Sequence, residues 1–207
     1  MSKYGYQGKG LGKREDGITK PIQGLNKTSF DSAATRYSWP SNTVLCAGDS
    51  MYNHIDEARI TRSLQGKFKV KVRAHPGATV GDMRHHLTAW LRKRPSHLIL
   101  HAGANDASNK DKTAKEIFEE LKELKNYAES IVPNIKVIMS CPTVRSDDLT
   151  ANAKSISIRA LLRSNMTDII TNENIGTDLL GKKGLHLSYK KGVGTLAKNI
   201  IEYLKSF

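Results

Sequence analysis

The sequence predicts a three-layer α/β/α sandwich with a central parallel sheet of about five strands. Its 207 residues allow one ordinary domain and a tail. From Asn42 onward, short apolar segments alternate with longer segments in which apolar residues recur at the spacing of a helix. Strands joined by helices of this length need right-handed crossovers, which make the strands parallel and cover both faces of the sheet with helices.

Each expected element follows from its own pattern. The five expected strands are Thr43 to Ala47, Phe68 to Val72, His97 to His101, Ile135 to Cys141 and Asp168 to Thr171. Three expected helices have buried faces made of Met83, Leu87, Trp90 and Leu91, of Ile117, Leu121, Leu124, Ala128 and Ile131, and of Val193, Leu196, Ala197, Ile200 and Leu204. In open parallel sheets, ligands bind beyond the carboxyl ends of the strands, so functional residues are expected there.

The chain is strongly basic, with 33 Lys and Arg residues, 20 acidic residues and a formal net charge of +13. This balance favours nucleic acid, another polyanion or an anionic surface as a partner, although a well-solvated basic protein would have the same composition. No run of about 18 apolar residues is present, and the first residues lack the apolar core of a secretory signal. We therefore expect no membrane partner and an intracellular location, cytoplasmic or nuclear.

The two cysteines, Cys46 and Cys141, both lie in expected buried strands. Lone thiols in such positions behave as small apolar residues, and they fit a reducing compartment. We expect both to be free thiols.

Residues 1–40 are expected to form a flexible basic tail, because they are poor in aliphatic residues and rich in Gly, Lys, Ser and Thr. Within them, residues 4–22 resemble the glycine-rich half of a G-patch, a short segment of RNA-associated proteins and of some retroelement polyproteins. The resemblance implies that Tyr4, Tyr6 and Leu11 are docking residues and that the basic side chains lie against an RNA or an RNA helicase. Those basic side chains are Lys9, Lys13 and Arg14. The alternative is a flexible basic linker.

Four loops that are far apart in the sequence are expected to meet at one edge of the sheet. They contain Ser50, Gly77, Asn105 and His186. Acyl transfer needs such a set: a nucleophile, a base that takes its proton, and donors aimed at the developing oxyanion. Taken alone, Ser50 could equally be an N-cap of the segment that follows it.

Motifs in these loops resemble those of the SGNH, or GDSL-type, hydrolase family across residues 43–207. They are Gly48-Asp49-Ser50, Gly77, Gly103-Ala104-Asn105-Asp106 and the late His186, in the order of the family. The resemblance implies the flavodoxin-like SGNH hydrolase fold, an acyl-Ser50 intermediate and His186 as general base. It also implies an oxyanion hole made by the Ser50 and Gly77 amides and the Asn105 side chain, a small ester or acyl substrate, and no cofactor.

One position departs from the family pattern. Members usually carry an aspartate three residues before the histidine, and Lys183 stands there. A lysine cannot accept a hydrogen bond from the imidazole, and its charge disfavours the imidazolium. Three interpretations remain open: a Ser-His dyad oriented by a backbone carbonyl, a displaced acid such as Asp178 or Glu173, or a degenerate site kept for binding. In the last case the domain would bind RNA through its basic surface and the G-patch-like tail.

The remaining polar residues have simpler interpretations. The histidines show no metal-ligand spacing with cysteines or carboxylates, so no metal site is expected. His101 is expected to pack under the site, Asp49 to stabilise its loop, and Asp106 to bond local amides. Arg92, Lys93 and Arg94 could contact phosphates, or complement a helix dipole. Four lysines flank His186 and would surround the mouth of the site with positive charge: Lys182, Lys183, Lys190 and Lys191. The order of the hydrolase-like motifs, the lysine before residues 184–188 and the G-patch-like tail together also look like the esterase-like domains of some metazoan transposable elements.

Overall fold

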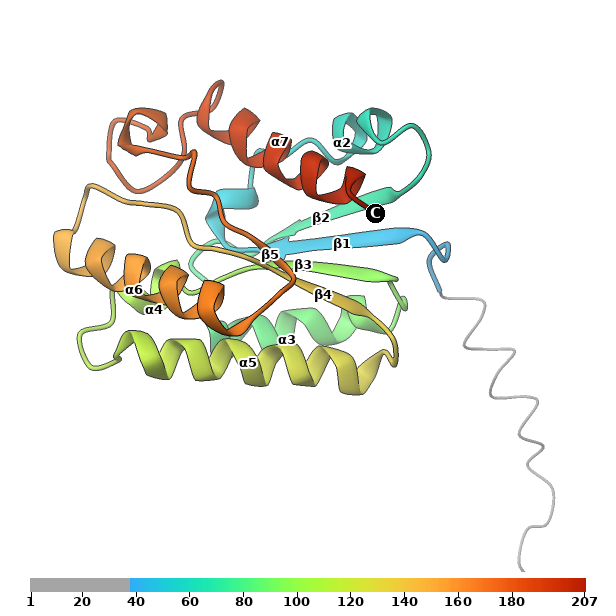
Figure 1. The fold of residues 1–207 in the computed structure, drawn as a ribbon, viewed down its shortest axis with the longest axis horizontal. Coiled ribbons are helices and arrows are strands. Elements are labelled where there is room, and N and C mark those ends of the chain that lie inside the picture. The colour runs from blue at the N-terminus through green and yellow to red at the C-terminus, as the bar shows by residue number, and fades with distance from the viewer. Residues whose placement is uncertain (1–37) are drawn as a thin grey trace, which may run out of the picture. The chain divides into compact units, whose positions relative to one another are not determined.

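A sheet of five parallel strands forms the centre of the computed structural model, which describes residues 38–207 (Figure 1). The strands are β1 Thr43–Gly48, β2 Lys69–Ala74, β3 His97–His101, β4 Lys136–Ser140 and β5 Ile169–Ile170. Their order across the sheet is β2-β1-β3-β4-β5, and every neighbouring pair is parallel. The predicted fold class and all five predicted strands are confirmed, with shifts of one or two residues at most ends.

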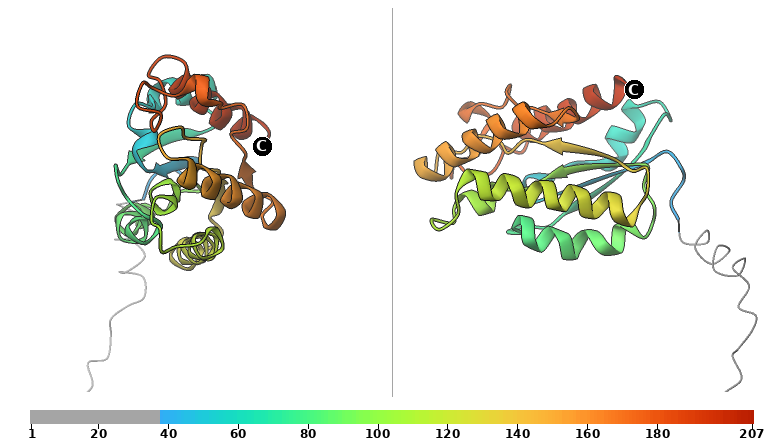
Figure 2. Two further views of the ribbon diagram at one scale, coloured as in Figure 1. Left: turned by 90° about the vertical axis from the view of Figure 1, so that its left-hand side faces the viewer. Right: turned by 60° about the horizontal axis from the view of Figure 1, so that its bottom comes forward.

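Helices cover both faces of this sheet (Figures 1 and 2). One face carries α2 Glu57–Ser63 and α7 Gly192–Lys205, and the other carries α3 Val80–Leu91, α5 Ala114–Ile131 and α6 Leu149–Asn165. Three short elements lie in the connections: the 3-10 turn η1 Ser50–Tyr52, the helix α4 Ala104–Ala107 and the 3-10 turn η2 Thr177–Leu179. The capping boxes begin α3 at Thr79 and α5 at Thr113, each closed by an acidic residue three positions on.

Two hydrophobic cores stabilise the layers, one on each face of the sheet. Strand β1 shows how: Leu45 and Ala47 pack under α3 and α5, whereas Val44 and Cys46 pack under α2 and α7. Alternate residues of a strand point to opposite faces, so a strand buried on both sides must be apolar throughout. All six residues of β1 are buried.

Three expectations for the helical segments need correction. Ile131 was expected on a buried face but is 39% exposed, because it is the last residue of α5. The segment after Ser50, of which Ser50 could have been the N-cap, forms only the single turn η1. Helices α2 and α6 were not expected, because α2 buries only Ile60 and the buried face of α6 includes Ala151 and Ser155.

Cys46 and Cys141 are free and buried, as predicted. Burial raises the pKa of the Cys141 thiol to about 11 and raises the pKa of Cys46 further. In residues 38–207, no helix has both the length and the apolar character needed to cross a membrane. The chain divides into two units, residues 1–36 and 37–207. Residues 1–37 of the expected flexible tail, with Lys9, Lys13 and Arg14, lie outside the described residues. The end of that predicted tail is wrong, because Trp39 stacks on Trp90 with ring centroids 6.1 Å apart and packs against the core.

Candidate active site at the carboxyl edge of the sheet

The register of the central strands brings three of the predicted loops together. Gly48 at the end of β1 pairs with Ala74 at the end of β2 on one side and with His101 at the end of β3 on the other. Ser50, Gly77 and Asn105 follow these three positions within a few residues. The loops that contain them therefore begin side by side at one edge of the sheet.

Ser50 is the first residue of η1, and its side chain is half-buried. The N-cap of this turn is Asp49, whose Oδ1 accepts a hydrogen bond from the Met51 amide at 3.0 Å. The interpretation of Ser50 as an N-cap is therefore wrong, and the prediction that Asp49 stabilises the loop is confirmed. Asp49 also donates its backbone amide to the His101 carbonyl at 3.2 Å, which ties the turn to β3.

Gly48 is needed here for space. A Cβ at this position would lie 2.9 Å from Cδ2 of Tyr52 and 3.1 Å from Cβ of His101. Both neighbours are fully buried, so neither can move aside without repacking the core. Gly48 is the last residue of β1.

His186 reaches Ser50 from the loop between η2 and α7. Its Nδ1 lies 3.4 Å from the Ser50 hydroxyl oxygen. Backbone hydrogen bonds hold this loop: Gly181 donates to the His186 carbonyl at 2.7 Å, and Ser188 donates to the Leu179 carbonyl at 2.8 Å. A serine and a histidine that are distant in the sequence thus form a nucleophile-base pair, at the longer separation common in structures without substrate.

No carboxylate orients the imidazole of His186. Among residues 38–207, none lies within hydrogen-bond or ion-pair distance of its ring. Glu173 pairs with Arg163, and Asp178 and Lys183 are exposed. The structure therefore does not bring either expected acid to His186. Because Nδ1 faces Ser50, the nitrogen that would meet an acid in a triad is already used.

Two further donors lie in the adjoining loops. Gly77 adopts φ +78°, a conformation that favours glycine, and its amide has no acceptor among the described residues. Asn105 Nδ2 donates to the Ala78 carbonyl at 2.8 Å. This bond uses one of the two amide hydrogens and fixes the side chain, which leaves the other hydrogen available. The Ser50 amide begins a turn and has no partner within it.

Two buried charges that sequence reasoning did not assign to the site hold these loops in place. Asp106 Oδ2 accepts a hydrogen bond from the Val80 amide at 3.0 Å, so it binds the first turn of α3 and not the local amides that were expected. Burial raises the pKa of Asp106. Arg145 Nη1 donates to the Ala104 carbonyl at 3.2 Å, next to Asn105. Neither role was recognisable, because each bond joins segments that are distant in the sequence.

His101 packs beneath the site, as predicted. It is fully buried, stacks on Tyr52 with ring centroids 5.3 Å apart, and places Nδ1 3.0 Å from the Ser140 hydroxyl. Asn172 Nδ2 donates to the same hydroxyl at 3.0 Å. Burial lowers the pKa of His101, so the neutral ring is favoured.

The remaining predicted residues lie elsewhere. Arg92, Lys93 and Arg94 follow the end of α3 beside the amino ends of the strands, at the edge opposite Ser50. Lys182, Lys183, Lys190 and Lys191 are exposed in the loop around His186. Within residues 38–207, no group of three or more His, Cys, Asp or Glu residues could hold a metal ion.

Comparison with known proteins supports both parts of the sequence interpretation. Residues 1–28 match the family model of the G-patch domain, which confirms the resemblance predicted for residues 4–22. A comparison with curated protein sequences gives no match.

Solved structures of GDSL-type lipases and esterases share the fold. A GDSL-like lipase from Bacteroides thetaiotaomicron has a TM-score of 0.63 and 16% identity, over 88% of this chain and 98% of that chain. The lipase/acylhydrolase from Enterococcus faecalis has a TM-score of 0.64 and 20% identity, over 80% and 96%. The psychrotrophic esterase EstA from Pseudoalteromonas, inhibited by monoethylphosphonate, has a TM-score of 0.63 and 16% identity, over 80% and 98%. This chain has the fold of these lipases and esterases.

Proposed function

We propose that this chain, built on the fold of the GDSL-type lipases and esterases, hydrolyses a small ester or related acyl bond through an acyl-Ser50 intermediate. The observation that carries the proposal is the 3.4 Å approach of the Ser50 hydroxyl to His186 Nδ1 at the carboxyl edge of the sheet. Two features support it: the turn that begins with Ser50 is capped by Asp49, and two polar donors, the Gly77 amide and the Asn105 side chain, lie in the adjoining loops.

The proposed reaction has two halves. His186 takes the proton of the Ser50 hydroxyl while the oxygen attacks the carbonyl carbon of the ester. The resulting oxyanion accepts hydrogen bonds from the Ser50 amide, the Gly77 amide and the Asn105 side chain. The intermediate then breaks the bond to the alcohol, which leaves with the proton from His186. In the second half, His186 takes a proton from water while the water oxygen attacks the acyl carbon. The second intermediate then releases the carboxylic acid as His186 returns the proton to the Ser50 oxygen.

We propose a Ser50-His186 dyad and not a triad. Glu173 is already paired with Arg163, and no carboxylate contacts the imidazole among residues 38–207. We therefore expect a slow esterase. In a well-studied triad, neutralising the acid lowers turnover about ten-thousandfold.

Hydrolysis of p-nitrophenyl acetate by the full chain tests this proposal. Ser50→Ala and His186→Ala should each abolish the burst and the steady-state rate above background, because each removes one partner of the dyad. His85→Ala is the matched control, since His85 is an exposed histidine on α3. Activity that persists in Ser50→Ala would contradict the proposal.

The second candidate function is a nucleic-acid-binding protein in which the domain is a scaffold with little or no activity. Two observations favour it: the G-patch match at residues 1–28 and the formal charge of +13. RNA, or an RNA helicase bound through the G-patch segment, would be the partner. Fluorescence anisotropy with a single-stranded RNA tests it, because affinity should fall steeply with salt if basic side chains contact phosphates.

We also propose an intracellular location, which the two free thiols support.

A further inference from the structure

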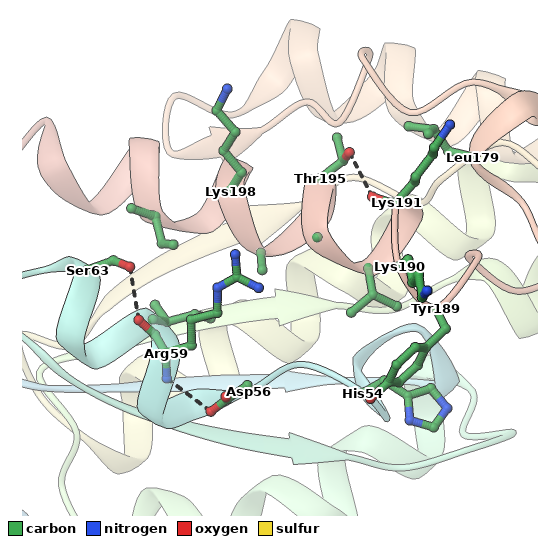
Figure 3. A pocket seen from close by; sticks show the side chains of 15 residues that line it. His54, Asp56, Arg59, Ser63, Leu179, Tyr189, Lys190, Lys191, Thr195 and Lys198 are labelled. Carbon is green, nitrogen blue, oxygen red and sulfur yellow. Dashed lines mark hydrogen bonds between the residues drawn. The ribbon is translucent and has the colours of Figure 1, made fainter.

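A pocket of about 820 Å³ lies between helices α2 and α7, on the face of the sheet that these helices cover (Figure 3). Neither Ser50 nor His186 lines it. Its walls come from the loop after η1, from α2, and from the start of α7 with the residues before it. This volume lies toward the upper end of small-molecule sites and exceeds what a single small anion needs.

The charges at this pocket are mostly positive and unpaired. Arg59, Lys190 and Lys191 line it, and among residues 38–207 no carboxylate is within ion-pair distance of any of them. Figure 3 shows the Arg59 guanidinium extending from α2 toward α7, across the pocket. The one carboxylate in the lining, Asp56, caps α2, because its Oδ1 accepts the Arg59 amide at 3.0 Å, and its charge offsets part of the positive charge of the pocket.

An exposed aromatic pair lies at one end of the pocket. Tyr189 is 71% exposed, and its ring meets the His54 ring edge-on with centroids 5.3 Å apart. Tyr189 follows His186 by three residues and His54 follows Ser50 by four, so this end belongs to the same two loops as the dyad. A flat ring that is mostly in solvent, next to unpaired cations, offers a stacking surface for a base.

The backbone at the start of α7 is open to the pocket. Gly194 lines the pocket, and a Cβ built at this position meets no heavy atom within 4 Å. The N-cap residue of α7, Lys191, makes no side-chain capping bond. The first two amides of the helix are already used, because Gly192 donates to the Ser188 hydroxyl at 3.0 Å and Val193 donates to the Ser188 carbonyl at 3.1 Å. The dipole of the helix still favours negative charge near its first turn. Unpaired cations and the positive end of α7 thus line the same cavity.

We propose that this pocket, defined by Arg59, Tyr189, Lys190 and Lys191, binds single-stranded nucleic acid, with the cations on the phosphates and Tyr189 stacked on a base. The inference rests on the second candidate function and is independent of hydrolysis at Ser50. It also moves the binding site away from the residues first expected for it, since Arg92, Lys93 and Arg94 lie at the opposite edge of the sheet. An acidic polypeptide or an anionic membrane would use the charges but would not need the aromatic ring.

The test compares two triple variants of the full chain that remove equal charge. The pocket variant is Arg59→Gln/Lys190→Gln/Lys191→Gln, and the control is Arg92→Gln/Lys93→Gln/Arg94→Gln. Binding of a fluorescein-labelled 20-nucleotide oligouridine is followed by anisotropy between 50 and 200 mM salt. Loss of three phosphate contacts should reduce the slope of log K against log salt by about 2 in the pocket variant. Its affinity should fall at least about tenfold, and that of the control less than about twofold.

Tyr189→Ala separates stacking from charge. Loss of one base-aromatic stack should weaken binding by about 5- to 100-fold without changing the salt slope. The circular dichroism spectra of all variants should match that of the unsubstituted chain, since every substituted side chain in the pocket is exposed.

The outcomes distinguish this inference from the function on which it rests. Equal losses of affinity in both triple variants would overturn the assignment of binding to the pocket, because net charge alone would then explain binding. Loss of binding only in Lys9→Gln/Lys13→Gln/Arg14→Gln would overturn the assignment of binding to the pocket but would leave the second candidate function in place. Absence of RNA binding by the unsubstituted chain would overturn both the pocket assignment and the second candidate function. Polyglutamate or anionic vesicles that compete fully, with no effect of Tyr189→Ala, would overturn the assignment to nucleic acid.

Discussion

Replacing Asn105 with alanine should reduce kcat of the ester hydrolysis while leaving KM nearly unchanged. The Asn105 amide donates one hydrogen to the Ala78 carbonyl at 2.8 Å, and this bond orients the other hydrogen in the proposed oxyanion hole. A donor that binds only the developing oxyanion lowers the barrier without binding the ground state. The expected loss is about 100- to 1000-fold in kcat, or about 2.7–4 kcal/mol.

The same substitution also has a cost in stability that can be separated from catalysis. It leaves the carbonyl of the buried Ala78 without its side-chain donor, which should lower the free energy of unfolding by about 1 kcal/mol. For a domain of this size, that loss corresponds to a decrease in Tm of about 2–4 °C. Urea denaturation measures this part, and kcat measured well below Tm is unaffected by it.

Two further variants make the reasoning refutable. Asn105→Asp keeps the shape of the side chain but replaces the donor with an acceptor, so it should be at least as inactive as Asn105→Ala. Asn126→Ala is the matched control, because Asn126 is exposed on α5. A kcat within about threefold of the unsubstituted chain in Asn105→Asp would refute the proposed role.

Three other predictions follow from described side chains. Lys183→Asp should raise kcat by about tenfold or more, because a negative charge in this loop can stabilise the His186 imidazolium through space although Nδ1 faces Ser50; an unchanged kcat would show that charge at that position does not reach the dyad. Burial lowers the pKa of His101 below its usual 6.5, so the unfolded chain binds that proton more readily than the native protein. Stability is therefore lost as pH falls below about 6.5, by up to about 1.4 kcal/mol per pH unit, and urea midpoints from pH 7.5 to 5.5 should show a shallower slope in His101→Asn. Cys46 and Cys141 are buried with raised pKa values, so DTNB should label neither thiol in the native chain and both in guanidinium; fast native labelling would contradict their burial.

The sheet was largely predictable from the sequence, because its strands are buried on both faces. Strand β3, His97–His101, was predicted to the residue: its apolar run has no competing helical period. Strand β5 is only Ile169–Ile170, too short for a pattern, and its expected ends were wrong by one residue on each side. Helix α6 was missed because Ala151 and Ser155 replace large apolar residues on its buried face.

The meeting of Ser50 with His186 was also predictable, since parallel strands bring their carboxyl ends to one edge. The orientation of the His186 imidazole was not predictable from the sequence. It depends on the loop before α7, which turns at Gly184 with φ +70° and packs so closely at Gly192 that a Cβ there would overlap the Leu179 carbonyl. Such contacts depend on the folded loop, and no sequence period reports them.

The pocket between α2 and α7 was not predictable for a similar reason. Arg59 lies on a helix that the sequence pattern did not reveal, and its neighbours Lys190 and Lys191 come from the far end of the chain. The lysines were noted as a rim of positive charge around His186, but only the packing of α2 beside α7 adds the guanidinium and the cavity.

Labelling of the full chain with a fluorophosphonate, followed by peptide mass spectrometry, tests the central claim most directly. A fluorophosphonate reacts with a serine whose hydroxyl is activated by a base, so the phosphonyl group should be found on Ser50. Labelling should disappear in Ser50→Ala and fall strongly in His186→Ala. Absence of any labelled serine, or a label on another serine that persists in Ser50→Ala, would contradict the claim that Ser50 and His186 form a hydrolytic dyad.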